Sequence, residues 1–351
     1  MGHDSAHRAR IAAVSLLFSI AIAGLVSATG ASSKTKTPAS KLYVADTQGD
    51  DLAVIDARNM KIIRQTQVGL NPHGAVASPD GRTLYVTIEG TNELVELNTV
   101  DDKVTRRVPV GRSPNEPTVT ADGRYVYVPL RNEAAVDVVE TQSFKVVDRI
   151  PVPAMPHNTY TSADGRHIYV GSMSGQRITV IDAATRKVLS EISPGNWVRP
   201  IAIKRDESLA YTALSTLHGF AVVDLHAGKV VKTVELPPLP PGTPKPFLDT
   251  YTHGLALSPD ENELYCTSMP GNAIHVFKLP ALERVAKVDV GRDPNWIVFR
   301  RDGRFAFVSN TTDNSVSCID TMSRKVTATI PVGHAPKRLV IVETGTKSEV
   351  Q

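Results

Sequence analysis

The sequence predicts an all-β fold, a seven-bladed β-propeller with four antiparallel strands in each blade. Two markers recur along the chain in one register, and repeats of about 40–45 residues built from short strands are typical of propeller blades. The first marker is a strand aromatic, found at Tyr43, Tyr85, Tyr127, Tyr169, Tyr211, Tyr265 and Phe307, with gaps of 42 residues except for one of 54. The second marker is a turn aspartate with the same gaps, found at Asp80, Asp122, Asp164, Asp206, Asp260 and Asp302.

One unit, residues 116–152, shows the four expected strands in order. The segment "EPTVTA" (116–121) precedes the Asp-Gly turn, "YVYVP" (125–129) follows it, and "AAVDVVE" (134–140) and "FKVVDRIPV" (144–152) complete the unit. Apolar residues alternate with the period of two that a half-buried β-strand requires. Asp-Gly favours a tight hairpin because both residues tolerate positive φ. The pattern therefore predicts a four-stranded antiparallel meander for this unit. No segment of the chain has helical periodicity.

The two ends of the chain are expected to share the last blade. Residues 41–68 contain three strands, "KLYVAD", "DLAVID" and "KIIRQTQV", but lack the innermost strand of a unit. Residues 336–343 contain "PKRLVIV", a lone innermost strand. Joining the two segments completes the seventh blade and closes the ring without a free sheet edge. We expect one propeller domain over residues 41–344, with a C-terminal tail at 345–351.

The N-terminus has the pattern of a secretory signal. Arg8 and Arg10 precede the apolar run "IAAVSLLFSIAIAGLVSA", which ends at Ala28 in the small-x-small form of a signal-peptidase site. We expect a signal peptide over residues 1–28 and a flexible tether over residues 29–40. The alternative is an uncleaved membrane anchor, because the run approaches spanning length. Cleavage would leave a periplasmic or extracellular protein without stable membrane insertion.

Composition and cysteine usage narrow the choice of partner. The 351 residues carry a net charge of +3, and basic residues are interspersed with acidic ones, which argues against nucleic acid as the main partner. Cys266 and Cys318, the two cysteines of the chain, fall on different repeats and are expected to be buried free thiols. We expect a monomer that binds a small ligand or another protein.

One polar position recurs seven residues before each turn aspartate. We call these positions the mouth ring: His73, Asn115, His157, Arg199, His253 and Asn295, with Lys337 as the equivalent in the closing strand. Each begins an innermost strand, so blade symmetry should bring the seven side chains to one end of the central channel, where propellers usually bind ligands. Neighbouring loops should add further residues at the same end: Glu116, Asn158, Trp296, Asp293, Arg292, His334, Arg338, Trp197 and His218.

The mouth ring has two interpretations. In the first, the position is polar because it borders a wet channel, and His, Asn, Arg and Lys all satisfy that need. In the second, the imidazoles of His73, His157 and His253 converge on one Cu or Zn ion, with Asn158 or Glu116 holding them by hydrogen bonds. The positive charge of Arg199 and Lys337 on the same ring disfavours a cation. His167, His226 and His275 fall on strand or turn positions away from the ring, where no ligand role is expected.

The gap of 54 residues marks an insertion between blades four and five. The segment "LPPLPPGTPKPFLDTYTHG" adds 12 residues and leads directly into His253. Its six prolines make it stiff and unable to pair as a central strand. It is either a surface loop without a ligand role or a semi-rigid wall beside the channel mouth.

The "YVT" and "YVG" strands, the "P-x-G" and "P-x-N" starts of the units and the "SPDG" turn resemble those of the YVTN β-propeller repeat proteins, which include YncE-like and surface-layer propellers. The resemblance covers essentially the whole chain after the signal. It implies an exported seven-bladed propeller that acts as a binding or surface protein, and it is specific for fold but poor for function.

Three functions follow as expectations. The first is an exported, non-catalytic binding propeller that recognises a small anionic or metal-containing ligand, or a protein partner, at the channel mouth. The second is a Cu or Zn site, or a redox-linked site, formed by the three ring histidines. The third is a hydrolase, by analogy with lactonase propellers, whose sites gather several carboxylates around a metal, whereas this mouth has few.

Overall fold

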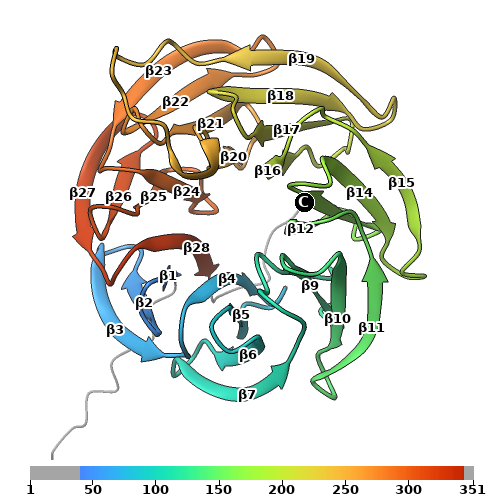
Figure 1. Ribbon diagram of the computed structural model, residues 1–351. Helices are drawn as coiled ribbons and strands as arrows, with labels where there is room; N and C mark the ends of the chain where they lie inside the picture. Colours follow the sequence, from blue (N-terminus) through green and yellow to red (C-terminus); the bar gives the residue numbers. More distant parts are fainter. Residues whose placement is uncertain (1–39, 344–351) are drawn as a thin grey trace, which may run out of the picture. The chain divides into compact units, whose positions relative to one another are not determined.

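The computed structural model describes residues 40–343, apart from the side chain of Leu248 (Figure 1). These residues form seven four-stranded antiparallel sheets placed around a central channel, which confirms the predicted propeller. The expected signal peptide at 1–28, the tether up to residue 39 and the tail at 345–351 lie outside the described residues. Within residues 40–343, no helix has the length and apolar character needed to cross a bilayer.

We number the blades from the first complete sheet along the chain. Blade 1 contains β4 (Pro72–Ala77), β5 (Thr83–Ile88), β6 (Glu93–Asn98) and β7 (Lys103–Pro109). Blade 2 contains β8 (Thr118–Val119), β9 (Tyr125–Leu130), β10 (Ala135–Glu140) and β11 (Lys145–Pro151). Blade 3 contains β12 (Pro156–Thr161), β13 (His167–Ser172), β14 (Arg177–Asp182) and β15 (Val188–Ile192). In each blade the first of these strands is the innermost (Figure 1).

The remaining blades follow the same order. Blade 4 contains β16 (Val198–Ile203), β17 (Leu209–Leu214), β18 (Gly219–Asp224) and β19 (Lys229–Glu235). Blade 5 contains β20 (Leu255–Leu257), β21 (Glu263–Ser268), β22 (Ala273–Lys278) and β23 (Glu283–Asp289). Blade 6 contains β24 (Pro294–Phe299), β25 (Phe305–Asn310), β26 (Ser315–Asp320) and β27 (Lys325–Pro331). Blade 7 contains β28 (Pro336–Glu343), β1 (Ser40–Asp46), β2 (Asp51–Asp56) and β3 (Lys61–Gln67).

Blade 7 closes the ring with strands from both ends of the described chain, as predicted. β28 pairs antiparallel with β1, so that Tyr43 lies opposite Val340 and Leu42 opposite Ile341. The first strand begins at Ser40, one residue before the expected domain boundary. With β28 included, every sheet has four strands, and each sheet contributes one inner strand to the ring (Figure 1).

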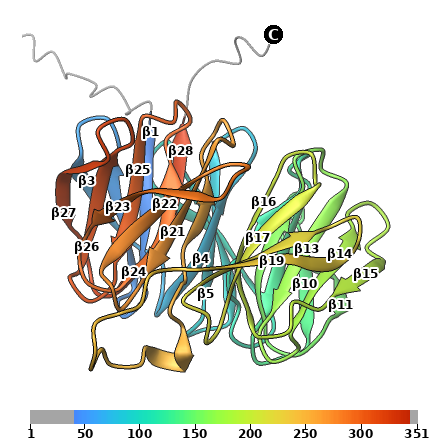
Figure 2. The ribbon, with the colours of Figure 1, turned by 90° about the horizontal axis from the view of Figure 1, so that it is seen from above.

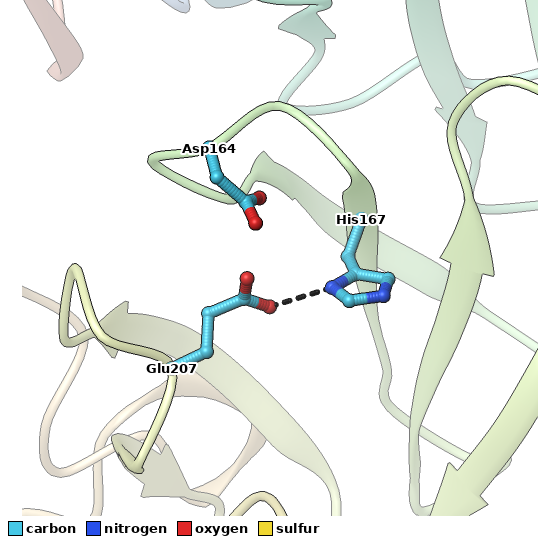
Figure 3. Close-up of side chains that lie close together, drawn as sticks. All are labelled: Asp164, His167 and Glu207. Atoms are coloured by element: carbon cyan, nitrogen blue, oxygen red, sulfur yellow. Dashed lines mark hydrogen bonds and ion pairs between the residues drawn. The ribbon is translucent and has the colours of Figure 1, made fainter.

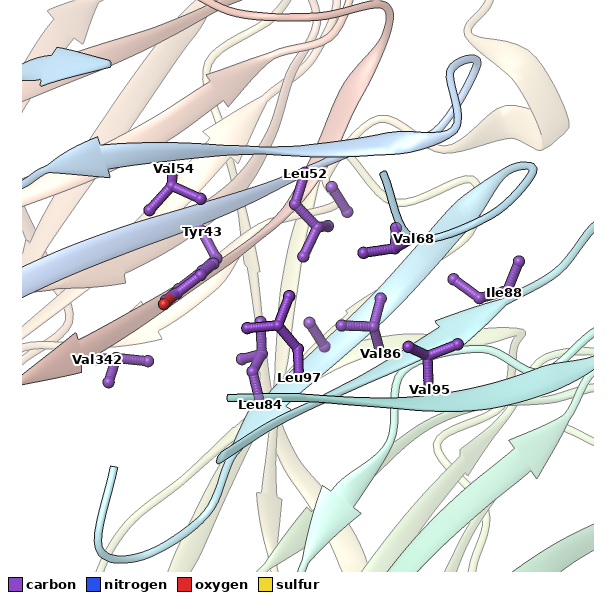
Figure 4. Close-up of a cluster of buried hydrophobic side chains, with 12 residues drawn as sticks. Tyr43, Leu52, Val54, Val68, Leu84, Val86, Ile88, Val95, Leu97 and Val342 are labelled. Carbon is purple, nitrogen blue, oxygen red and sulfur yellow. The ribbon is translucent and has the colours of Figure 1, made fainter. Parts of the chain in front are cut away.

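The core lies between neighbouring blades rather than within one sheet. Figure 4 shows Tyr43 and Leu52 of blade 7 packed with Leu84 and Val86 of blade 1. The strand aromatic that marks each repeat also reaches the next blade, because the Tyr43 hydroxyl donates a hydrogen bond to Asp102, 2.6 Å away, in blade 1. The repeated aromatic is therefore an element of blade-to-blade packing.

The two cysteines behave as predicted. Cys266 on β21 and Cys318 on β26 are buried free thiols in adjacent blades. Burial raises the pKa of the Cys266 thiol to about 12, so it stays protonated and inert at neutral pH.

The insertion between blades 4 and 5 follows β19 and carries a short 3-10 helix, η1 (Phe247–Asp249). Figure 2 shows this gold segment projecting at one end of the strands. The end of the insertion is hydrogen-bonded to both neighbouring blades. The Thr216 amide of blade 4 donates to the Asp249 carbonyl at 2.8 Å, and the Met269 amide of blade 5 donates to the Tyr251 carbonyl at 2.9 Å. These bonds hold the insertion against blades 4 and 5.

Candidate functional site

The mouth ring surrounds a cavity of about 540 Å³. Six of its seven residues line this cavity: His73, His157, Arg199, His253, Asn295 and Lys337. Pro246, Phe247 and Thr250 of the insertion line it too, so the insertion forms part of the wall of the mouth. We call this cavity the mouth pocket.

The inner strands bulge where the ring residues stand. The β4–β5 register shifts between Pro72 and Ala75, so His73 and Gly74 lie outside the regular ladder. The Thr87 hydroxyl accepts a hydrogen bond from the freed Gly74 amide at 2.8 Å and donates to the Asn115 carbonyl at 2.8 Å. Bulges redirect side chains, and here the bulge places His73 at the pocket. The threonine of the "YVT" pattern therefore stabilises the bulge.

A hydroxyl side chain accepts from a backbone amide next to the ring residue in other blades too. In blade 5, the Thr267 hydroxyl accepts from the Gly254 amide at 2.8 Å, next to His253. In blade 6, the Ser309 hydroxyl accepts from the Trp296 amide at 3.1 Å, next to Asn295. The hydroxyl residue stands two positions after the strand aromatic each time.

Gly74 allows the first two blades to approach each other closely. A Cβ atom at this position would lie 2.6 Å from the Asn115 carbonyl oxygen and 2.7 Å from the Glu116 Cα. Both are backbone atoms, which cannot move aside cheaply. Glycine next to His73 therefore sets the narrow spacing of the inner strands at the mouth.

The three ring histidines are buried side by side. The ring centroids of His157 and His73 are 6.5 Å apart, and those of His157 and His253 are 5.6 Å apart. Burial lowers the pKa of all three imidazoles well below the usual value, and the charge of Arg338 lowers it further. The three side chains are therefore neutral at pH 7.

The placement of these imidazoles bears on the predicted Cu or Zn site. Their ligand atoms are not grouped within 4.8 Å of one another, since Asp164, His167 and Glu207 form the one such group of three in residues 40–343. The positive charges beside the histidines also oppose a cation. A metal bound by all three would require the rings to move, and the Cu or Zn site stays a prediction.

Arg338 is the central cation of the mouth. Its side chain is fully buried, and its Nε donates a hydrogen bond to Glu116 Oε2 at 2.9 Å. Its guanidinium lies over the Trp296 ring, 4.2 Å from the centroid, and its Nη1 donates to Asn295 Oδ1 at 3.3 Å. Its Nη2 has no hydrogen-bond partner within the described part of the chain. Arg338 is thus fixed in place, and its Nη2 amino group is left without a partner among residues 40–343.

Burial acts against both charges of the Arg338–Glu116 pair. It raises the pKa of Glu116 and lowers the pKa of Arg338, while the charge of each residue opposes the shift of the other. The desolvation cost of a buried ion pair is offset only when its geometry is good and further hydrogen bonds complete it. The Nε–Oε2 distance here is 2.9 Å, and Asn295 supplies one further hydrogen bond.

Two further cations face the pocket. The Arg199 Nε donates to Ser215 Oγ at 2.9 Å and its Nη1 contacts Met173 Sδ at 3.0 Å. Burial lowers the pKa of Arg199 to about 10, with a further contribution from the charge of Arg338. Burial and then Arg338 also lower the pKa of Lys337. Both residues stay protonated at pH 7 and carry positive charge to the pocket.

Four of the predicted ligand-binding residues, one of them the ring member Asn115, are not among the lining residues. Asn115 and Glu116 belong to the inner segment of blade 2, and Asn158 Oδ1 contacts His157 Nδ1. The side-chain amide nitrogens of Asn115 and Asn158 have no hydrogen-bond partner among residues 40–343. The Trp296 ring stacks against the Arg338 guanidinium. These residues position the lining rather than form it.

The other predicted loop residues divide into two groups. Asp293 lines the pocket, and its carboxylate accepts a hydrogen bond from the Thr312 hydroxyl. Arg292 instead pairs with Asp313 at 2.6 Å, and His218 Nε2 is hydrogen-bonded to Ser268 at 2.7 Å. Arg292, His218, Trp197 and His334 are not among the lining residues.

Sequence reasoning missed a second set of lining residues. They follow the second strand of each blade, four positions after the strand aromatic, and we call them the turn ring: Thr47, Glu89, Arg131, Met173, Ser215, Met269 and Thr311. Four of them, Arg131, Met173, Met269 and Thr311, line the pocket. Glu89 pairs with Arg131, and Ser215 bonds Arg199. The repeat spacing predicts these positions, but they carry hydroxyl, charged and apolar side chains and so show no common residue type that would indicate a site.

A group of a different kind lies between blades 3 and 4 (Figure 3). His167 Nδ1 is 2.8 Å from Glu207 Oε2, and the Tyr169 hydroxyl also donates to Glu207. Asp164 accepts hydrogen bonds from the Ser162 hydroxyl at 2.7 Å and from the Arg166 backbone amide at 3.0 Å. Each member is held by a protein partner, so the group joins two blades through hydrogen bonds. His167 thus contributes a contact between blades 3 and 4.

A larger hollow, about 860 Å³, lies at the outer turns of blades 5 and 6. Three of its four cations are engaged in ion pairs, Arg324 with Glu263 at 2.7 Å, Arg301 with Glu343 at 3.4 Å and Arg304 with Asp320. Its lining contains no buried polar atom without a hydrogen-bond partner. The mouth pocket is therefore the stronger candidate site.

Comparison with known proteins places the chain by fold and family. Among solved structures, it is similar to Kuenenia stuttgartiensis hydrazine synthase, with a TM-score of 0.69 and 19% identity over 83% of this chain and 98% of that chain. The periplasmic gluconolactonase PpgL of Pseudomonas aeruginosa gives a TM-score of 0.72 and 20% identity over 87% and 99% of the two chains. At such identities the likeness shows the fold alone.

A putative 6-phosphogluconolactonase of Bacteroides fragilis is similar too, with a TM-score of 0.72 and 15% identity over 88% of this chain and 99% of that one. A search of curated proteins found no match. Residues 20–204 match the sequence model of a family described as YNCE-like beta-propeller. That match covers more than half of the chain and agrees with the resemblance seen in the repeats. This chain therefore belongs to the YNCE-like β-propeller family.

Proposed function

We propose that this protein is a non-catalytic binding propeller that recognises a small anionic ligand in the mouth pocket. The observation that carries the proposal is Arg338, a buried arginine held by Glu116 and Trp296 with its Nη2 unpartnered in residues 40–343. A buried donor without a partner is costly, and an anionic acceptor would remove that cost. The Nη2 amino group carries two N–H donors, and a carboxylate or phosphate oxygen accepts charge-assisted hydrogen bonds from such donors.

The charge balance around the pocket supports an anion rather than a cation. Glu116 and Glu89 are engaged in ion pairs with Arg338 and Arg131. Arg199 and Lys337 then bring two further positive charges, against one negative charge from Asp293. The three neutral imidazoles add no charge and can each donate or accept a hydrogen bond. A low-dielectric pocket with a positive surplus favours an anionic ligand.

Binding rather than catalysis is favoured by the state of the carboxylates. Each acid near the pocket is already engaged, Glu116 and Glu89 in ion pairs and Asp293 with Thr312. A lactonase-like site would use free carboxylates to hold a metal. The activities named for the structural relatives are not transferred to this chain, because the fold alone is shared.

We further propose that the protein acts outside the cytoplasm, as the signal pattern at residues 1–28 indicates. The ligand would then be met in the periplasm or at the cell surface. Mass spectrometry of the native protein tests this, since export with cleavage predicts a terminus near Thr29 and an intact Met1 would contradict it.

The anion-binding proposal is tested by calorimetric titration of citrate and inorganic phosphate into the wild-type protein and Lys337→Met. Lys337 lines the pocket, and the nearby acids Glu89 and Glu116 are paired with Arg131 and Arg338, so its removal takes away charge without leaving either acid unpaired. We expect at least one anion to bind, and Lys337→Met to weaken it about fivefold to tenfold, which corresponds to about 1–1.4 kcal/mol. Affinity should also fall as salt is raised.

Lys325→Met is the matched control, because Lys325 is exposed at the start of the outer strand β27. It should leave the affinity within twofold of the wild-type value. Absence of binding to the wild-type protein, or equal affinities for the two lysine variants, would contradict an anion site at the mouth.

A further inference from the structure

We infer that the ligand is an amphiphilic anion, an acid group attached to an aromatic or similarly apolar body. This inference rests on the proposed function, and it adds the chemical class of the ligand. It follows from the two unlike ends of the mouth pocket: a buried cationic end at Arg338, and an apolar rim at Phe247.

Phe247 is the main observation at the rim. It lines the pocket, yet 85% of its side chain is exposed. Large aromatic side chains are usually buried when they have a neighbour to cover them. Single exposed apolar residues are common on protein surfaces, but Phe247 lines a cavity together with other apolar side chains, as the residues of small-molecule sites do.

Three methionines extend the apolar surface inward. Met155, Met173 and Met269 line the same pocket, Met173 fully buried and the other two partly so. Methionine is unbranched and polarizable, and it adapts its shape to flat or irregular apolar groups. These side chains come from blades 2–3, 3 and 5, so an apolar body would be contacted from several sides.

The position of Phe247 is set by the insertion. Pro246 precedes it, and η1 is closed by the Asp249 amide, which donates to the Pro246 carbonyl at 3.0 Å. The Thr216 amide holds the Asp249 carbonyl at 2.8 Å, which ties η1 to blade 4. Prolines reduce the freedom of the unfolded and unbound segment. The ring is therefore presented before any ligand arrives, which lowers the entropic cost of binding.

The cationic end of the pocket is also held in place by protein contacts before a ligand binds. Arg338 is fixed by Glu116 and Trp296, and Lys337 lies beside it on β28. An acid group at this end would therefore lie beside cations of which one, Arg338, is already held in place by protein contacts. The pocket, about 540 Å³, lies within the range that holds small organic ligands of this kind. An acid group at the deep end leaves the body of the ligand against the methionines and Phe247.

The experiment compares 2-naphthoate, its neutral analogue 2-naphthamide and the polar anion citrate, titrated calorimetrically into the wild-type protein and Phe247→Ser. We expect naphthoate to bind and naphthamide to bind at least tenfold more weakly, because it lacks the charge. Phe247→Ser should weaken naphthoate about fivefold and leave citrate within twofold of its wild-type affinity.

The matched control is Met322→Ser, since Met322 is 78% exposed at an outer turn of blade 6, away from the mouth. It should not change any affinity. Both substituted side chains are exposed, so the thermal unfolding of each variant should match that of the wild-type protein.

The outcomes separate the two claims. If citrate binds while naphthoate does not, or if Phe247→Ser leaves naphthoate unchanged, the amphiphilic class is wrong and the anion site stands. If neither citrate, phosphate nor naphthoate binds, both the inference and the proposed function fail. Equal affinity for naphthoate and naphthamide would contradict the role of the cationic end.

Discussion

The neutral state of the ring histidines sets how single residues at the mouth respond to pH. Burial and the charge of Arg338 lower the pKa of His73, His157 and His253 well below its usual value. In the unfolded chain each imidazole takes up a proton below about pH 6.5. The folded protein does not, so the unfolded state binds more protons and stability falls as pH drops below that value.

We predict that the triple variant His73→Asn/His157→Asn/His253→Asn loses part of this acid sensitivity. Each imidazole contributes a slope of about 1.4 kcal/mol per pH unit once the pH is below about 6.5. Asparagine is already present in this register at Asn115 and Asn295, so the substitutions suit the fold. Urea unfolding at pH 7.5 and pH 5.5 measures the effect. Equal pH dependence of the variant and the wild-type protein would contradict the neutral imidazoles.

Prediction from sequence succeeds at this scale where the repeat fixes the register. Counting back from the turn aspartates gives six positions of the mouth ring, and the closing strand supplies Lys337 as the seventh. Six of the seven line one cavity. The partner of Arg338 was not predictable, because Glu116 lies 222 residues away and the repeat says nothing about which ring members pair. The arrangement of charges within a ring depends on side-chain packing.

At the level of elements, the bulge at the start of each inner strand links the repeat pattern to the site. The sequence signature "YVT" predicts a strand, but its threonine also satisfies backbone groups that the bulge frees. That role could not be derived from the pattern, because a bulge leaves no mark of its own in the periodicity. The insertion was identified from its length and prolines, whereas the exposure of Phe247 followed only from how η1 is anchored.

We predict that Thr87→Val destabilises the protein by about 1–3 kcal/mol. Valine has the shape of threonine, so the change leaves the Gly74 amide and the Asn115 carbonyl without their buried partner. Denaturant unfolding measures the loss. Thr105→Val, at an exposed position on β7, should change stability by less than about 0.5 kcal/mol. A similar loss for both variants would show that the hydroxyl of Thr87 has no special role.

At the scale of the whole molecule, closure of the ring depends on one strand. β28 supplies the inner strand of blade 7 and carries Lys337 and Arg338, so the fold and the candidate site share it. Closure was predictable from sequence, because the two ends of the chain are complementary fragments of one repeat unit. The three-dimensional shape of the pocket was not, since it depends on how side chains from the inner strands, the loops and the insertion pack together.

We predict that truncation after His334 abolishes the cooperative unfolding transition of the intact protein. It removes β28, which buries Leu339 and Val342 and pairs along the whole of β1. The exposed edge of β1 should also promote aggregation. Truncation after Glu343 keeps every strand and serves as the control. A shortened protein ending at His334 that melts like the control would contradict closure by β28.

The central claim is that the mouth pocket holds an acid group at Arg338 and an apolar body at Phe247. It is tested most directly by the crystal structure of the protein soaked with 6-bromo-2-naphthoate, with the bromine located by anomalous scattering. We predict the carboxylate within about 3 Å of Arg338 Nη2 or the Lys337 amine, and the bromine next to Phe247. An ordered bromine at the outer hollow of blades 5 and 6 with none at the mouth would contradict it, as would a carboxylate lying against Phe247.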